Sequence, residues 1–116
     1  MKFLMMIKVD ENVGMPPQAL FDAMGKLIAE QSASGVLVET AGLRRSAEGA
    51  RVQVRNGRIN VLDGPFTEAK ELVGGFAIIN AASRDEAIGH ARDFVQLHVT
   101  HWPGLEFECE VRQIEG

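Results

Sequence analysis

The sequence of 116 residues predicts an α+β fold, in which two helices lie on one face of an antiparallel sheet. Strand, helix and strand patterns follow one another in each half of the chain, which is the first observation behind this prediction. The second is a hairpin signal, Asn56-Gly57, between the two halves. The third is an apolar fraction of 46%, typical of globular proteins. The length fits a single domain, and we expect it to span residues 1–116.

The first half of the chain opens with a predicted strand at residues 2–9. Apolar residues occupy both its odd and its even positions, so both of its faces need to be covered. Residues 16–34 carry the apolar stripe of an amphipathic helix, with two prolines suited to its first turn and Gly35 suited to its end. Residues 36–43 predict a second strand.

The hairpin between the halves has the clearest local pattern. Residues 51–55 and 58–62 alternate apolar and polar side chains around the two-residue loop Asn56-Gly57. The register of such a loop pairs four β-branched residues on one face, Val52 with Val61 and Val54 with Ile59. A helical turn is predicted shortly after the hairpin, at residues 67–71, with Thr67 as its cap.

The second half repeats the order of the first. Gly74-Gly75 opens a strand at residues 76–80 that is again apolar on both faces. Ser83 and Glu86 form a capping box at the start of a helix. A polar connection is expected at residues 97–105. A last strand follows, with Cys109 and Val111 on one face and a row of acidic residues expected toward solvent.

Strand, helix and strand, repeated twice, predict the split βαβ or ferredoxin-like arrangement. The two helices cover one face of the sheet, but two of its strands are apolar on both faces. Leaving the second face wet exposes an apolar patch of a size that monomers rarely show. We therefore expect a homodimer in which two sheets pack face to face about a two-fold axis.

Charge and composition exclude several classes of protein. The net charge of −4 argues against direct nucleic-acid binding, and no apolar run is long enough to span a membrane. The apolar run at the N-terminus is too short for a signal peptide, and the lone Cys109 suits a reducing compartment, so we expect a cytoplasmic protein. One basic cluster is either a set of solvated side chains or an anion-binding rim. It comprises Arg44, Arg45, Arg51, Arg55 and Arg58.

Several motifs together resemble one known family over nearly the whole chain. They are Asp63-Gly64-Pro65-Phe66, Gly74-Gly75-Phe76, Gly35-Val36-Leu37-Val38 and His98-Val99-Thr100-His101-Trp102-Pro103-Gly104. This set resembles the DGPF, or YCII-related, family. The resemblance implies a dimeric α+β barrel and, for some members, association with extracytoplasmic-function sigma factors. Some proteins of the wider superfamily have a His/Asp pair with the histidine on the first helix, which residues 16–34 lack.

Asp63 is the leading candidate for a catalytic residue. One interpretation is structural: Asp63 makes an Asx-type turn, and Gly64-Pro65 end the strand. The other is chemical. Asp63 has the parity of the apolar hairpin residues, which predicts a partly buried carboxylate that acts as an acid, a base or a ligand anchor.

The other candidates lie in three places. His98 and His101 lie beside Trp102 and are catalytic candidates. They are either hydrogen-bonded histidines of a loop, with Trp102 packing at the dimer seam, or acid/base groups beside an aromatic wall. Glu39, Phe66, Lys70 and Trp102 are candidates for substrate binding, Glu39 because it interrupts an apolar strand. We expect no metal and no cofactor, because the sequence has no zinc spacing, phosphate loop or dinucleotide fingerprint.

Three functions remain open from the sequence. The first is a small-molecule enzyme that uses acid/base chemistry in a pocket of the dimeric barrel. The second is a ligand-binding or regulatory module that acts with a sigma factor. The third is a structural dimer without catalysis.

Overall fold

The computed structural model describes residues 1–66 and 71–116. The elements in chain order are β1 (Lys2–Val9), α1 (Gln18–Ser34), β2 (Leu37–Gly42), the 3-10 helix η1 (Ser46–Glu48), β3 (Ala50–Arg55), β4 (Arg58–Asp63), β5 (Leu72–Asn80), α2 (Arg84–His101) and β6 (Glu108–Gln113). The helical turn predicted at residues 67–71 lies largely outside the described residues. Within them, no helix has the length and apolarity needed to cross a bilayer.

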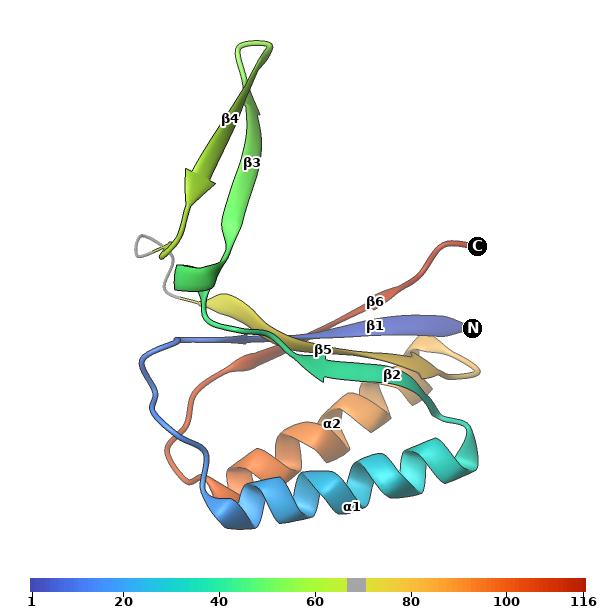
Figure 1. Cartoon of the computed structure of the whole chain (residues 1–116). Helices are drawn as coiled ribbons and strands as arrows, with labels where there is room; N and C mark the ends of the chain where they lie inside the picture. Colours follow the sequence, from blue (N-terminus) through green and yellow to red (C-terminus); the bar gives the residue numbers. More distant parts are fainter. Residues whose placement is uncertain (67–70) are drawn as a thin grey trace.

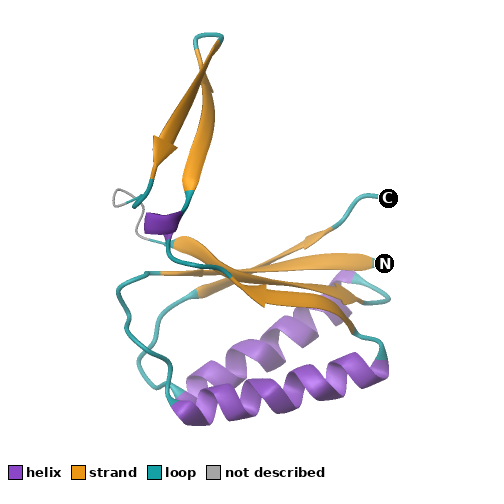
Figure 2. Ribbon diagram, viewed as in Figure 1, coloured by secondary structure: helices purple, strands orange, loops and turns teal. Residues whose placement is uncertain are grey.

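Four strands form an antiparallel sheet in the order β2-β5-β1-β6. Both helices lie against one face of this sheet, and the β3–β4 hairpin rises on the other side (Figure 1; Figure 2). This order and layering confirm the predicted α+β, ferredoxin-like split βαβ arrangement with an inserted hairpin.

The register of the central pair, β1 and β5, decides which side chains form the core. Phe3 pairs with Ile79 and Met5 with Ala77 on the face that the helices cover. Phe3, Met5 and Ile79 are buried there in one cluster with alanines of α2. Because Ala87 and Ala91 are small, α2 packs close to the sheet.

The opposite face of the sheet, here called the outer face, has no covering layer within the described chain. Its central residues are Leu4, Met6, Phe76 and Ile78, which pair directly across β1 and β5 and are half-buried. The first and fifth strands are thus apolar on both faces, as the sequence pattern predicts.

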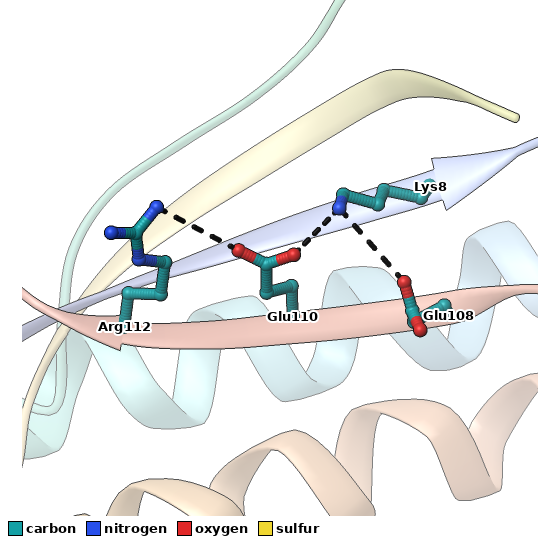
Figure 3. Close-up of polar contacts among 4 residues, drawn as sticks. All are labelled: Lys8, Glu108, Glu110 and Arg112. Atoms are coloured by element: carbon teal, nitrogen blue, oxygen red, sulfur yellow. Dashed lines mark hydrogen bonds and ion pairs between the residues drawn. The ribbon is translucent and has the colours of Figure 1, made fainter. Parts of the chain in front are cut away.

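A row of charged side chains borders this apolar centre on β6. The Lys8 Nζ donates a hydrogen bond of 2.6 Å to Glu110 Oε1 and lies 3.9 Å from Glu108 (Figure 3). Arg112 approaches the other carboxylate oxygen of Glu110 at 4.0 Å. The bond raises the pKa of Lys8 and lowers the pKa of Glu110, so both stay charged at neutral pH. Cys109 and Val111 of the same strand pack against the core, so the acidic row faces away from the helices, as the alternation predicts.

The helix ends follow the sequence signals with two corrections, the first being that α1 begins at Gln18, so that Pro16 and Pro17 precede the helix instead of lying in its first turn. Gly35 ends α1 in the left-handed region at φ 83°, and the Ser83 hydroxyl accepts the N–H of Glu86 at the start of α2. However, α2 continues to His101, so the polar connection predicted from residue 97 was wrong. The apolar stripe of α2 continues through Phe94 to the buried His98, and packing on the sheet extends the helix.

The fifth strand also differs from its prediction, because it begins at Leu72 rather than after the two glycines. Gly74 and Gly75 lie inside the strand where neighbouring chains come close. A Cβ at Gly75 would lie 3.2 Å from the carbonyl oxygen of Ala41 on β2, so the glycine permits this close approach.

The hairpin has the predicted register and turn. Asn56 and Gly57 both have positive φ, 53° and 74°, as the two-residue turn requires. Val52 pairs with Val61 and Val54 with Ile59, which confirms the predicted pairing. These four residues, here called the apolar stripe, are 64–73% exposed.

Candidate functional site

Asp63 lies at the end of β4, opposite Ala50, and is exposed. Its side chain makes no hydrogen bond with any described residue. The predicted Asx-type turn is therefore absent, because the residue two positions on is Pro65, which has no N–H. Asp63 shares the face of the apolar stripe, but the stripe is not part of this chain's core. Its carboxylate accordingly lies in solvent rather than at the rim of a buried cleft.

The rest of the tetrapeptide ties the base of the hairpin to the body of the protein. The Gly64 N–H donates to the Gly49 carbonyl at 2.9 Å, and the Phe66 N–H donates to Ser46 Oγ at 3.1 Å. The Ser46 hydroxyl and N–H in turn donate to the two carboxylate oxygens of Glu11, at 2.9 and 2.5 Å. Ser46 is buried, so these bonds form away from most of the solvent.

Gly64 stands at the tightest point of this contact. A Cβ placed on it would lie 1.7 Å from the Ser46 carbonyl oxygen, well inside the contact distance of any pair of atoms. The Gly64–Pro65 peptide bond is cis. Only glycine fits here, and the requirement is one of space rather than chemistry.

Phe66 and Lys70 are two of the predicted substrate-binding residues, and the structure describes Phe66. The Phe66 ring lies under the guanidinium of Arg51, 3.9 Å from the centroid, which is a cation–π contact at the foot of the hairpin. Lys70 lies outside the described residues.

An apolar cavity lies between the sheet and the two helices, on the side opposite the outer face. Its volume is about 420 Å³, which suits a small organic molecule. Its walls are formed by residues of β1, α1 and α2, among others, and include Met5, Ile7, Met24, Leu27, Phe94 and His98. We call it the helix–sheet cavity.

His98 is the buried titratable group of this cavity. Its ring lies between Phe94 and Phe107, with both centroid distances 4.7 Å, so the predicted aromatic wall consists of these two rings rather than Trp102. Nδ1 lies 3.0 Å from the Phe94 carbonyl, a distance at which Nδ1–H donates to that oxygen. Nε2 makes no hydrogen bond with a described residue. Burial lowers the pKa of His98, so the ring is neutral near pH 7 and Nε2 is a free acceptor.

Two further polar residues line the cavity and were not predicted as site residues. Gln31 lies on α1, and its side-chain amide makes no hydrogen bond within the described residues. The Thr40 hydroxyl on β2 donates to the Phe76 carbonyl at 2.9 Å, which leaves its oxygen able to accept. Gln31 continues the stripe of Leu20, Met24 and Leu27 at helical spacing, and a polar residue at that place was the available signal.

The remaining candidates do not come together with His98. His101 and Trp102 are half-buried at the end of α2, where Trp102 borders a shallow depression with Asp10. Glu39 pairs with Ile78 and is exposed at the border of the outer face. The sequence-predicted residues thus fall in separate regions, and among those that the structure describes, His98 is the one that lines the helix–sheet cavity.

Neither Cys109 nor a grouping of metal ligands offers a second reactive centre in the described chain. Burial raises the pKa of Cys109 to about 11, so its thiol stays protonated and is a poor nucleophile near pH 7. Within residues 1–66 and 71–116, no three His, Cys, Asp or Glu side chains are grouped in a way that could hold a metal ion.

Comparison with known proteins identifies one family and one relative. The family model described as the YCII-related domain matches residues 1–97. An uncharacterised protein of Rhizobium meliloti (strain 1021) is 42% identical over 60 residues, which are 52% of this chain and 48% of that protein. The chain therefore matches about half the length of this curated relative.

Replacing Gly64 by alanine tests the close contact at the hairpin base. We expect Gly64→Ala to lower the free energy of unfolding by about 2 kcal/mol or more, because the new Cβ displaces the Ser46 backbone. Gly25→Ala is the matched control: Gly25 lies within α1, and an added Cβ would meet no atom within 4 Å, so it should raise stability by about 0.5–1 kcal/mol. Urea denaturation measures both, and equal effects would contradict the contact.

His98 predicts a dependence of stability on pH. Its pKa is lower in the folded chain than its ordinary value of about 6.5, so near and below that pH the unfolded chain binds a proton that the folded chain does not. Stability should therefore fall as the pH drops from about 7 through the lowered pKa of His98. His98→Phe should lose less stability than wild type on acidification, whereas His101→Phe should behave as wild type. Urea denaturation across this pH range measures the difference.

Proposed function

This chain belongs to the YCII-related family, and within that family we propose that it binds a small, largely apolar molecule in the helix–sheet cavity, with His98 as acceptor and base. The observation behind this proposal is that His98, whose Nε2 makes no hydrogen bond with a described residue, lines an apolar cavity of about 420 Å³. The remaining cavity walls select a molecule that is mostly apolar and has a single acidic O–H or N–H group.

The chemistry of His98 follows from its two nitrogens. The Phe94 carbonyl holds the Nδ1–H and thereby fixes the tautomer in which Nε2 carries the lone pair. Nε2 accepts a hydrogen bond from a bound molecule, and the same nitrogen takes the proton when that molecule is acidic enough. Gln31 and Thr40 supply further polar contacts that orient the molecule in the cavity.

A second copy of the chain is part of the proposal. The outer face has an apolar centre that includes Met6 and Phe76, and nothing in the described chain covers it. A group of half-buried apolar side chains that no layer covers is typical of an interface. A two-fold dimer that packs the outer faces together is the proposed assembly, with the cavities on the far sides of the two sheets.

Two expectations rest on other grounds. Cys109 has no disulfide partner, which fits a reducing compartment and a cytoplasmic location. Association with a sigma factor stays a prediction from the family resemblance, since no described surface favours it over a second copy of the chain. A purely structural dimer does not account for the Nε2 of His98, which makes no hydrogen bond with a described residue.

Ligand binding is tested with 2-naphthol and its methyl ether, 2-methoxynaphthalene, which lacks the O–H donor. The wild-type protein should bind 2-naphthol about threefold to tenfold more tightly than the ether, the range expected for one hydrogen bond. His98→Phe preserves the ring contacts but removes the acceptor, so this preference should disappear. Fluorescence titration or calorimetry measures the affinities.

The control is His101→Phe, which changes the same residue type outside the cavity and should keep the preference. Binding of 2-naphthol should also weaken as the pH falls through the lowered pKa of His98, because protonated Nε2 no longer accepts a hydrogen bond. If His98→Phe keeps the wild-type preference, the proposed role of His98 is wrong.

The dimer is tested with two methionine substitutions. Wild type should have twice the chain mass of 12.7 kDa by light scattering. Met6→Lys places a charge at the centre of the outer face and should shift the protein to monomer, while the neighbouring Glu110 helps the single chain to tolerate it. Met15→Lys is the matched control, because Met15 is 84% exposed in a loop. A monomeric wild type would refute the dimer.

A further inference from the structure

The apolar stripe of the hairpin is a group of four exposed apolar side chains in the described chain. Val52, Val54, Ile59 and Val61 are 71, 66, 73 and 64% exposed. Their register places them as two directly paired rows on one face of β3 and β4. Figure 1 shows this hairpin standing clear of the sheet and both helices, so the described part of its own chain does not cover the stripe.

A projecting hairpin of this composition is expected to pack against another surface. A two-stranded hairpin is marginally stable by itself in water, and contiguous exposed apolar side chains mark surfaces that become buried. Among the described strands, β3 and β4 pair only with each other, so both long edges of the hairpin are also free to pair or pack. The hairpin therefore presents an apolar surface that stays exposed to solvent in an isolated monomer.

The charges indicate which partner fits. Residues 50–63 contain three arginines and one aspartate, which is a net charge of +2. Because the whole chain has a net charge of −4, the rest of the chain carries a net charge of −6. Arg55 and Arg58 pair at the tip of the hairpin, where they reach farthest from their own body. Glu39, Glu108 and Glu110 border the outer face together with Lys8 and Arg112, which form ion pairs with Glu108 and Glu110, so the acidic balance is that of the body as a whole. A basic hairpin thus complements the acidic body of another copy of the same chain.

The position of the hairpin agrees with this partner. It rises from the side of the sheet that carries the outer face, opposite the helices (Figure 1). We propose that the β3–β4 hairpin is an arm whose apolar stripe packs on a second copy of the chain. This inference rests on the proposed dimer: a copy seated on the outer face lies beside the arm, and two-fold symmetry gives each copy one arm around the other.

The tetrapeptide at the arm's base gives this arm a fixed direction. The bonds from Phe66 and Gly64 hold the arm on η1, and Ser46 binds Glu11 of the β1–α1 loop. An arm fixed before association loses less conformational freedom when it binds its partner. The Asp-Gly-Pro-Phe motif is thereby assigned to assembly rather than to the chemistry of the cavity.

Two neighbouring residues of β4 give a matched test. Ile59→Asp puts a charge in the apolar stripe, whereas Asn60→Asp puts the same charge on the opposite face of the same strand. Ile59→Asp should raise the dimer dissociation constant on the order of 100-fold, because the substitution strikes both arms of the symmetric dimer. Asn60→Asp should leave it within about threefold of wild type. Sedimentation equilibrium measures the constants, and circular dichroism checks that Ile59→Asp keeps its fold.

The outcomes separate this inference from the proposed dimer. Loss of affinity in Ile59→Asp with little change in Asn60→Asp supports the arm. If Met6→Lys dissociates the dimer but Ile59→Asp does not, the outer face is the interface and the arm proposal is overturned. A monomeric wild type overturns the arm as well, and leaves the apolar stripe to a different protein. A fold-competent second variant, Val54→Asp, must repeat the result of Ile59→Asp for the proposal to stand.

Discussion

The pairing of β1 with β5 is the constraint on which the rest of the structure depends. Both strands are apolar on both faces, so the sheet they form needs cover on both sides. The helices cover one side and make a core around Phe3 and Ile79. The other side, with Met6 and Phe76, is left uncovered by the described residues, and both the proposed dimer and the proposed role of the hairpin follow from that one imbalance.

The two faces of the sheet consequently carry different features. The helix side contains the cavity in which His98 keeps Nε2 free between two phenylalanine rings. The outer side carries apolar and charged surface and the arm. The proposed ligand site and the proposed dimer interface therefore lie on opposite faces of one sheet, which allows His98 and Met6 to be altered independently.

The Asp-Gly-Pro-Phe tetrapeptide illustrates why a distinctive motif need not be a reactive one. Gly64 is required because the Ser46 carbonyl lies where its Cβ would be, and Phe66 is held through its N–H and its ring. Asp63, the residue with a reactive group, is exposed and makes no bond with a described residue. The motif is specific because several chain segments pack closely at the hairpin base. Close packing restricts the residue types at these positions as strongly as catalysis does.

The sequence by itself determined the order of the elements, the hairpin register and the two-sided apolar strands, because these depend on local periodicity and turn chemistry. It also marked His98, but not its neighbours: Phe107 packs on the His98 ring and Gln31 lines the same cavity, each from a distant part of the chain. Only the tertiary structure decided that Asp63 lies in solvent, since its parity with Ile59 and Val61 means burial only if the hairpin packs on its own core. The direction in which the hairpin leaves the sheet is fixed by long-range contacts at Ser46, and no pattern along the chain encodes them.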